Sequence, residues 1–143
     1  MSEGEKQEIL NLIADWRNAL ENKDFDRLFA NYSPDVVFYD CKPPHQLVGI
    51  PAIKAMWEEC SPHLPARFRS EHRDLSVRVN NNLAFVHGLH RFVALVDEEK
   101  WKNIFTWVRI TVCYAKIDGK WMVVHEHCSM PFDPLTGMVS LIV

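Results

Sequence analysis

Apolar side chains recur at helical spacing through the N-terminal part of the chain. Over residues 2–21, four of them fall on one stripe, which predicts a long amphipathic helix that packs this stripe against a core. The stripe consists of Ile9, Ile13, Trp16 and Leu20. Asp24, a residue type that caps helix N-termini, precedes a second and shorter stripe. Pro51 suits the first turn of a third helix, which Pro62 ends.

Beyond Arg67 the period of the apolar positions changes to two, with many β-branched and aromatic residues, and this pattern indicates strands. The segments concerned are 73–79, 83–96, 103–117 and 120–128, and a further strand is expected at 33–40. The turns between the four later segments are short, so consecutive strands run antiparallel. The sequence therefore predicts an α+β protein in which three helices precede an antiparallel meander.

Composition narrows the classes of function. The chain has 143 residues, 48% of them hydrophobic, which suits one domain over residues 1–143. Its formal net charge of -3 comes from 16 basic and 19 acidic side chains scattered along the sequence, so we expect no nucleic acid and no membrane as a partner. The polar, acidic N-terminus and the lack of a long apolar run predict a cytoplasmic protein.

The cysteines form no motif for a metal or a redox reaction. Cys41, Cys60, Cys113 and Cys128 are widely separated, without a Cys-x-x-Cys pair. Without a secretion signal, reduced thiols are the expectation. We therefore expect neither a disulfide nor a cofactor.

Three segments of the sequence resemble one superfamily. They are "NYSPDVVFYD", "LVGIPAIKAMW" and "RITVCYAKIDGKWMVVHEHCS", in the order in which that superfamily has them, and the last is similar to a SnoaL-like pattern that ends in His-x-His-x-Ser. The superfamily includes nuclear transport factor 2, ketosteroid isomerase, the SnoaL-type polyketide cyclases and the association domain of calcium/calmodulin-dependent kinase. The resemblance implies a cone-shaped fold of three N-terminal helices packed on a strongly curved antiparallel sheet.

Asp40 ends the first predicted strand, where the resemblance places the general base of ketosteroid isomerases. Those enzymes also need an oxyanion hole made of a tyrosine and a protonated aspartic acid. This sequence has Trp16 near the place of the tyrosine and Thr111 near that of the acid, and neither donor is as acidic as the original. Ketosteroid isomerisation is therefore not expected. Asp40 is either a catalytic base or a loop carboxylate that accepts backbone N–H bonds.

His125 and His127 lie two positions apart, so on a regular strand both side chains point to the same face. A three-residue turn with Gly119 in the left-handed conformation sets His125 opposite Thr111. The same register sets His127 opposite Arg109. We prefer this register because it gathers the polar side chains on one face, which is then the concave inside of the cone.

A two-residue turn is the alternative, and it sets the two histidines opposite Val112 and Ile110 instead. In the preferred register, Ile110, Val112 and Tyr114 lie on the outer face of the sheet. Two of the strands are apolar on both faces, and a second subunit is the simplest cover for the outer one. The sequence therefore predicts a homodimer.

The histidine pair allows three interpretations. A metal site would need a third ligand, for which His87, His90 and Asp40 are available, but Arg109 on the same face repels a cation, so no metal is expected. The imidazoles otherwise either hydrogen-bond within the sheet as semi-buried polar groups, or hold and protonate a ligand.

The candidate catalytic residues are Asp40, His125 and His127, and the candidate ligand-binding residues are Arg109, Thr111, Trp16, Tyr39 and Trp57. We expect a SnoaL-like protein whose cone binds a small organic molecule, partly apolar or anionic. As an enzyme it would be a cofactor-free isomerase, cyclase or dehydratase that acts by proton transfer. The alternative is a non-catalytic association module of the kinase-hub type. An open pocket with a desolvated Asp40 would distinguish the enzyme from the module.

Overall fold

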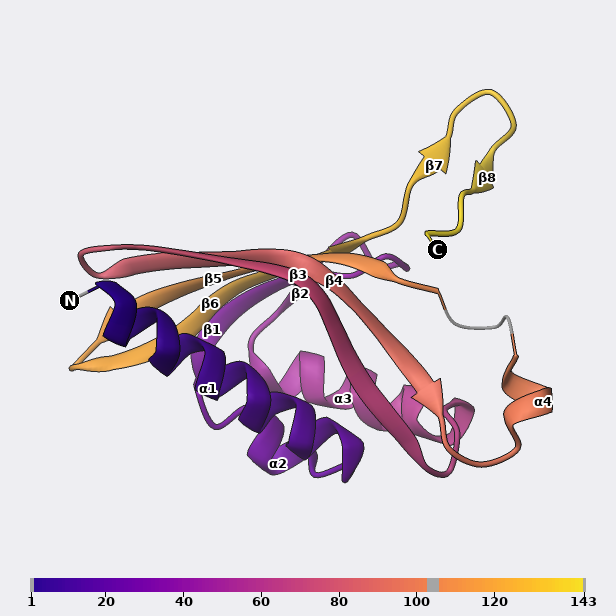
Figure 1. Ribbon diagram of the computed structural model, residues 1–143, viewed down its shortest axis with the longest axis horizontal. Coiled ribbons are helices and arrows are strands. Elements are labelled where there is room, and N and C mark those ends of the chain that lie inside the picture. The colour runs from indigo at the N-terminus through magenta and orange to yellow at the C-terminus, as the bar shows by residue number, and fades with distance from the viewer. Residues whose placement is uncertain (1, 103–105, 143) are drawn as a thin grey trace.

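The first three helices along the chain lie on one side of a strongly curved sheet in the computed structural model, which describes residues 2–102 and 106–142 (Figure 1). The helices are α1 (Ser2–Glu21), α2 (Phe25–Leu28), α3 (Ile50–Cys60) and α4 (Glu98–Trp101), with one 3-10 turn at Ser61–His63. The strands are β1 (Tyr32–Tyr39), β2 (Leu47–Val48), β3 (Phe68–Asn80), β4 (Leu83–Ala94), β5 (Val108–Ile117), β6 (Lys120–Ser129), β7 (Phe132–Asp133) and β8 (Met138–Val139).

The main sheet has the strand order β2-β1-β6-β5-β4-β3. Strands β3 to β6 form the expected antiparallel meander, and β1 joins it by pairing in parallel with β6. The α+β class and the cone-shaped architecture are therefore confirmed. One helical turn, α4, occupies the predicted turn before β5, and β5 begins at Val108 rather than at residue 103; residues 103–105 lie outside the described part of the chain.

Each predicted helix begins where its sequence signal places it. The Asp24 side chain accepts a hydrogen bond from the backbone N–H of Arg27 at 3.1 Å and so caps α2. Pro51 lies in the first turn of α3, where a missing N–H has no effect on the helical hydrogen bonds. In the described chain no helix is long and apolar enough to cross a membrane.

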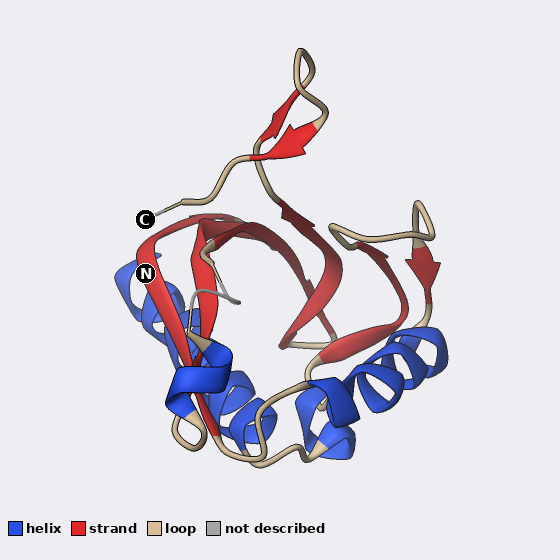
Figure 2. Ribbon diagram, turned by 90° about the vertical axis from the view of Figure 1, so that its right-hand side faces the viewer, coloured by secondary structure: helices blue, strands red, loops and turns tan. Residues whose placement is uncertain are grey.

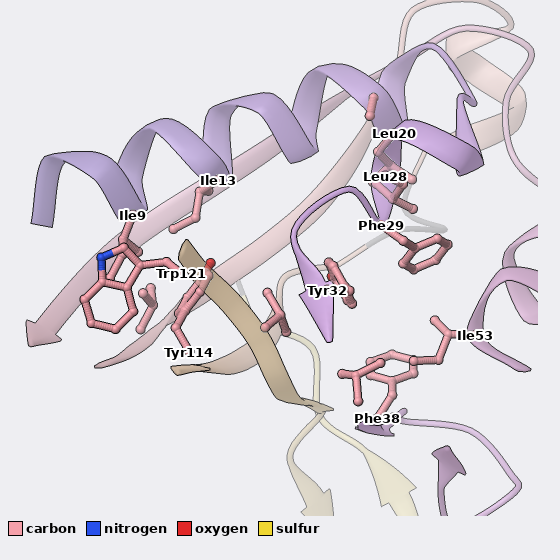
Figure 3. Close-up of a cluster of buried hydrophobic side chains, with 14 of the residues drawn as sticks. Ile9, Ile13, Leu20, Leu28, Phe29, Tyr32, Phe38, Ile53, Tyr114 and Trp121 are labelled. Atoms are coloured by element: carbon pink, nitrogen blue, oxygen red, sulfur yellow. The ribbon is translucent and has the colours of Figure 1, made fainter. Parts of the chain in front are cut away.

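The apolar stripe of α1 packs onto the concave face of the sheet. Ile9 and Leu20 are fully buried, with Ile9 beside Trp121 and Leu20 beside Leu28 of α2 (Figure 3). Burying one such side chain stabilises the fold by about 1.5–3 kcal/mol. Trp16, on the same stripe, is only half-buried, since it lies where the cone opens into a cavity.

Two bulges bend the sheet. In β3 the register shifts between Arg73 and Ser76, with Asp74 in the left-handed conformation at φ 57°. Gly88 of β4 faces this bulge closely: a Cβ there would lie 2.9 Å from Leu75 Cδ2 and 3.0 Å from the Arg73 carbonyl oxygen. Only a glycine lets the two strands approach at the bend.

The second bulge lies in β6, a few residues after the turn that joins this strand to β5. Asp118 and Gly119 both have positive φ, 50° and 78°, which makes a two-residue turn that pairs Ile117 with Lys120. The predicted three-residue turn is therefore wrong, because an Asp-Gly pair accepts the conformation that matches the twist of the strands. Tyr114 then pairs with Val123, but the next pair is Cys113 with His125, so Val124 is an extra residue. The bulge reverses the alternation of faces along the rest of β6.

The C-terminal hairpin of β7 and β8 stands away from the sheet, on the side opposite the helices (Figures 1 and 2). Its large apolar side chains are exposed, Leu135 by 94%. Near its end, the Thr106 hydroxyl donates to the Ile142 carbonyl at 2.9 Å and accepts from the Ile142 N–H at 3.1 Å. These two bonds tie the end of the hairpin back to the segment before β5.

Replacing Gly88 by alanine should lower the free energy of unfolding by about 1–3 kcal/mol, because the added methyl group forces backbone atoms of the β3 bulge apart. Gly4→Ala is the matched control: no atom lies near its Cβ, so in α1 it should be neutral or stabilising by up to about 1 kcal/mol. Urea unfolding curves measure both. A Gly88→Ala protein as stable as the wild type would show that the bend does not require glycine.

Candidate functional site

A cavity of about 520 Å³ lies between the helices and the concave face of the sheet. Its wall is mainly apolar and includes Leu12, Trp16, Phe38, Met56, Trp57, Val86, Phe92, Val108, Ile110, Val112 and Val123. This volume and this lining are typical of sites for small organic molecules. Trp16 and Trp57 therefore lie at the cavity, as the sequence predicts for them.

Glu126 lies in this apolar wall. Its side chain comes from β6, two residues after the bulge, and accepts a hydrogen bond from the Tyr32 hydroxyl. Glu126 is half-buried and lines the cavity. Burial raises the pKa of Glu126 from 4.5 to about 7; the nearby Asp40 charge also raises it, while the bond from Tyr32 opposes the rise. A carboxyl group with this pKa both accepts and releases protons near neutral pH.

Tyr32 holds the Glu126 carboxyl group in place. Tyr32 is 7% exposed, and burial, with the Glu126 charge, raises the pKa of its phenol well above the ordinary value. The phenol therefore stays protonated and donates. The hydrogen bond from Tyr32 thus joins β1 to β6 at the cavity.

Asp40 lines the same cavity from the end of β1. Its Oδ1 accepts the backbone N–H of Cys41 at 2.7 Å, as expected for a loop carboxylate, and its charge helps to raise the pKa of Glu126. The desolvated carboxyl group of the cavity is therefore Glu126. Sequence reasoning missed Glu126 because regular alternation from Trp121 places it on the outer face.

A second polar cluster lies on β3 and β4. The rings of His72 and His90 are 5.0 Å apart, and the Trp16 ring lies 5.8 Å and 5.5 Å from them. His90 Nε2 is 2.7 Å from the Ser70 hydroxyl. Burial is the main cause that lowers the pKa of His72 to about 4 and that of His90 to about 3. Both imidazoles are uncharged at neutral pH. Sequence reasoning missed this pair, because the β3 bulge shifts the register so that His72 pairs with His90.

The expectation that Arg109, Thr111, His125 and His127 line the cavity is wrong. None of them is among its lining residues, and Thr111 pairs with His127 on the convex face, where both are exposed. The reason is the β6 bulge: Trp121 and Val123 point inward before it, and even-numbered residues do so after it. These two histidines and Arg109 share one face, as predicted, but it is the outer face.

Tyr39 also points outward, with its ring edge-on to His125 at 4.7 Å and to His127 at 5.4 Å. His125 Nδ1 is 2.7 Å from the Val37 carbonyl oxygen, so this imidazole is a satisfied, half-buried polar group of the sheet. Conversely, three residues placed on the outer face by the predicted register line the cavity: Ile110, Val112 and Tyr114. Over residues 2–102 and 106–142, no group of three or more metal-ligating side chains converges.

Comparison with known proteins gives the family. Residues 9–133 match the sequence model of the SnoaL-like domain. An NTF2-like protein of unknown function from Pseudomonas putida KT2440 is 32% identical, with a TM-score of 0.88 over 100% of this chain and 98% of its own. No curated protein sequence matches the chain significantly.

Two more distant structures share the fold alone. A candidate dehydratase of the NTF2-like family from Streptomyces avermitilis is 14% identical, with a TM-score of 0.74 over 92% of this chain and 99% of its own. A candidate association domain of calcium/calmodulin dependent protein kinase II from Xanthomonas campestris is 22% identical, with a TM-score of 0.69 over 85% and 84%. The same fold thus accompanies two different descriptions of function.

Glu126→Gln should change how stability depends on pH. The folded state raises the pKa of Glu126, so its protonated form is favoured, and the wild type loses stability as pH rises from 4.5 through about 7. Relative to the wild type, the variant should gain about 2–3 kcal/mol of unfolding free energy across this range. Urea unfolding at a series of pH values measures the difference. Glu59→Gln, at an exposed position of α3, is the control and should run parallel to the wild type.

Proposed function

The chain belongs to the SnoaL-like family, and we propose that it binds a small, largely apolar organic molecule in the cone and transfers a proton on it through Glu126. One observation carries this proposal: a carboxyl group with a pKa of about 7, hydrogen-bonded to Tyr32, lies in an apolar cavity of about 520 Å³. A fold that needed the cavity only for packing would fill it with apolar side chains, since a desolvated carboxylate costs stability.

The chemistry that this arrangement supports is proton transfer at carbon. The Glu126 carboxylate takes a proton from a carbon next to a carbonyl group, the electron pair moves to the carbonyl oxygen, and the protonated carboxyl group later returns the proton to another atom of the same molecule. This is the class of cofactor-free isomerases, cyclases and dehydratases. Asp40, the base expected from the sequence, contributes through its charge, which keeps Glu126 basic enough to react.

The alternative is an association module. It is supported by the likeness to the candidate kinase association domain and by the large apolar side chains that the chain leaves exposed on its outer surface. A module of this kind needs no buried carboxyl group. Glu126 therefore favours the enzyme. Assembly and catalysis are also compatible, because they use opposite faces of the sheet.

We also propose that two copies of the chain pair through the convex face, each with its hairpin lying against the other. The convex patch consists of Tyr39, Phe85, His87, Arg109, Thr111, His125 and His127, which include a cation and three imidazoles and no carboxylate. The hairpin carries exposed apolar side chains and one charged residue, Asp133. Hairpin and convex patch are complementary in charge and lie on the same side of the molecule, so one twofold contact covers both (Figure 2).

We also propose that the protein is located in the reducing cytoplasm. Cys41, Cys60, Cys113 and Cys128 are free thiols, and none of them is in a disulfide. Free thiols persist where the compartment keeps them reduced.

β-Tetralone, a two-ring ketone with exchangeable protons beside its carbonyl, tests proton transfer. In deuterated buffer, NMR should show that the protein accelerates exchange by about 100-fold or more over buffer. The rate should rise with pH through an inflection near 7, because the ionised Glu126 is the base. Asp40→Asn should move this inflection to lower pH, since it removes a charge that raises the pKa of Glu126.

Glu126→Gln should return the exchange rate to that of buffer, while Glu59→Gln should exchange like the wild type. Calorimetry shows in parallel whether the ketone binds. Undiminished exchange by Glu126→Gln would remove Glu126 from the reaction. Binding without any accelerated exchange by the wild type would leave a binding protein or an association module.

Sedimentation velocity tests the proposed pairing. The wild type should sediment at twice the mass of the chain at micromolar concentration, and Leu135→Glu should shift it to the monomer by burying a charge in the contact. Ala55→Glu adds the same charge on the exposed side of α3 and should leave the dimer intact. A monomeric wild type, or a Leu135→Glu dimer, would contradict the role of the hairpin.

A further inference from the structure

The proton-transfer proposal leaves the His72–His90 pair without a role, although both rings line the cavity. His90 is 5% exposed and is held by Ser70 through its Nε2. His72 Nδ1 is buried and makes no hydrogen bond with any residue that the structure describes. Buried polar atoms are normally paired, so a buried nitrogen without a partner, in a ring that lines a cavity, indicates a binding group.

The register of the sheet shows how far this pair lies from Glu126. Glu126 pairs with Val112, and Val112 pairs with Val86, whereas His90 lies four residues beyond Val86 along β4. Strands are about 4.8 Å apart and rise about 3.4 Å per residue, so two strand spacings and four residues amount to roughly 16 Å along the sheet. Both polar ends point into the cavity from the concave face, so their polar atoms lie closer together than this span along the sheet. The concave positions between the two polar ends are Val86, Gly88, Ile110 and Val112.

The histidine end suits an uncharged group. Burial, with Arg17 nearby, lowers the pKa of both imidazoles, so at neutral pH each ring offers one donor or one acceptor and no charge. The positive charge of Arg17 also repels a cationic ligand group. Arg17 itself does not line the cavity, so an anionic group at the histidine end would lose its water there without contacting a cationic side chain.

We infer that the ligand of this cavity has two polar ends: an apolar ring body, a reactive carbonyl-bearing end at Glu126, and an uncharged hydroxyl or carbonyl group that hydrogen-bonds to the His72–His90 pair. This inference rests on the proposed function, because it assigns the second end of the same ligand. It predicts that elongated molecules of about two rings, with an oxygen at each end, bind better than those with one oxygen.

Isothermal titration calorimetry with three probes of one shape tests the inference. p-Phenylphenol has one hydroxyl group, and p,p′-biphenol has one hydroxyl group at each end. The third probe is the biphenyl that carries a hydroxyl group at one end and a carboxylate at the other. The wild type should bind p,p′-biphenol about 3- to 10-fold more tightly than p-phenylphenol, as one neutral hydrogen bond contributes. It should bind the carboxylate more weakly than p,p′-biphenol.

His72→Phe keeps a ring of similar shape against Trp16 and His90 and removes the nitrogen atoms. The advantage of p,p′-biphenol over p-phenylphenol should disappear in this variant. His90→Phe is the second variant, and thermal unfolding shows that each remains folded. If the advantage of p,p′-biphenol survives in both variants, or if the carboxylate binds more tightly than p,p′-biphenol, the inference is wrong.

Ile110→Trp separates this outcome from a failure of the proposed function. Ile110 lies opposite Gly88, so the larger side chain fills the middle of the cavity and should abolish binding of all three probes. Failure of p-phenylphenol to bind the wild type, or binding that Ile110→Trp leaves intact, contradicts the proposed cavity function and the inference with it. Normal binding of p-phenylphenol without a gain for p,p′-biphenol contradicts the inference alone.

Discussion

The extra residue in β6 decides which side chains face the cavity, and the proposed chemistry depends on it. Trp121 and Val123 point into the core before the bulge, and regular alternation would send His125 and His127 after them. Because Val124 has no partner on β5, Glu126 and Cys128 point inward instead. A shift of one residue thus exchanges two imidazoles for one carboxyl group.

Desolvation then gives that carboxyl group its properties. In water Glu126 would be fully ionised at neutral pH, but the apolar wall, and next the charge of Asp40, raise its pKa to about 7. Tyr32 limits the rise and orients the group. The arrangement lowers stability above that pH, and an ionised carboxylate retained at such a cost is typical of a functional site. The two neutral histidines across the cavity follow the same principle with the opposite direction of shift.

The curved sheet separates two kinds of surface. Its concave face, covered by the helices, is apolar with a few isolated polar groups, which suits a small molecule. None of the helices that the structure describes covers its convex face (Figure 2). That face carries aromatic rings, imidazoles and a guanidinium group, beside a hairpin with exposed apolar side chains. These are features of a surface that another protein chain covers. The proposed binding and the proposed assembly therefore use opposite sides of one bent sheet.

The sequence by itself determined the elements and their order, because helix stripes, strand periods and capping residues act over a few neighbouring positions. It also placed Asp40, Trp16 and Trp57 correctly at the cavity, since each follows directly from an element and the fold that the resemblance implies. Only the tertiary structure decided that His125, His127, Arg109, Thr111 and Tyr39 face outward, because a β-bulge leaves no signal in the alternation that it interrupts. Glu126, His72 and His90 likewise became visible only in the fold, since the burial and charges that shift a pKa come from residues far apart in the chain.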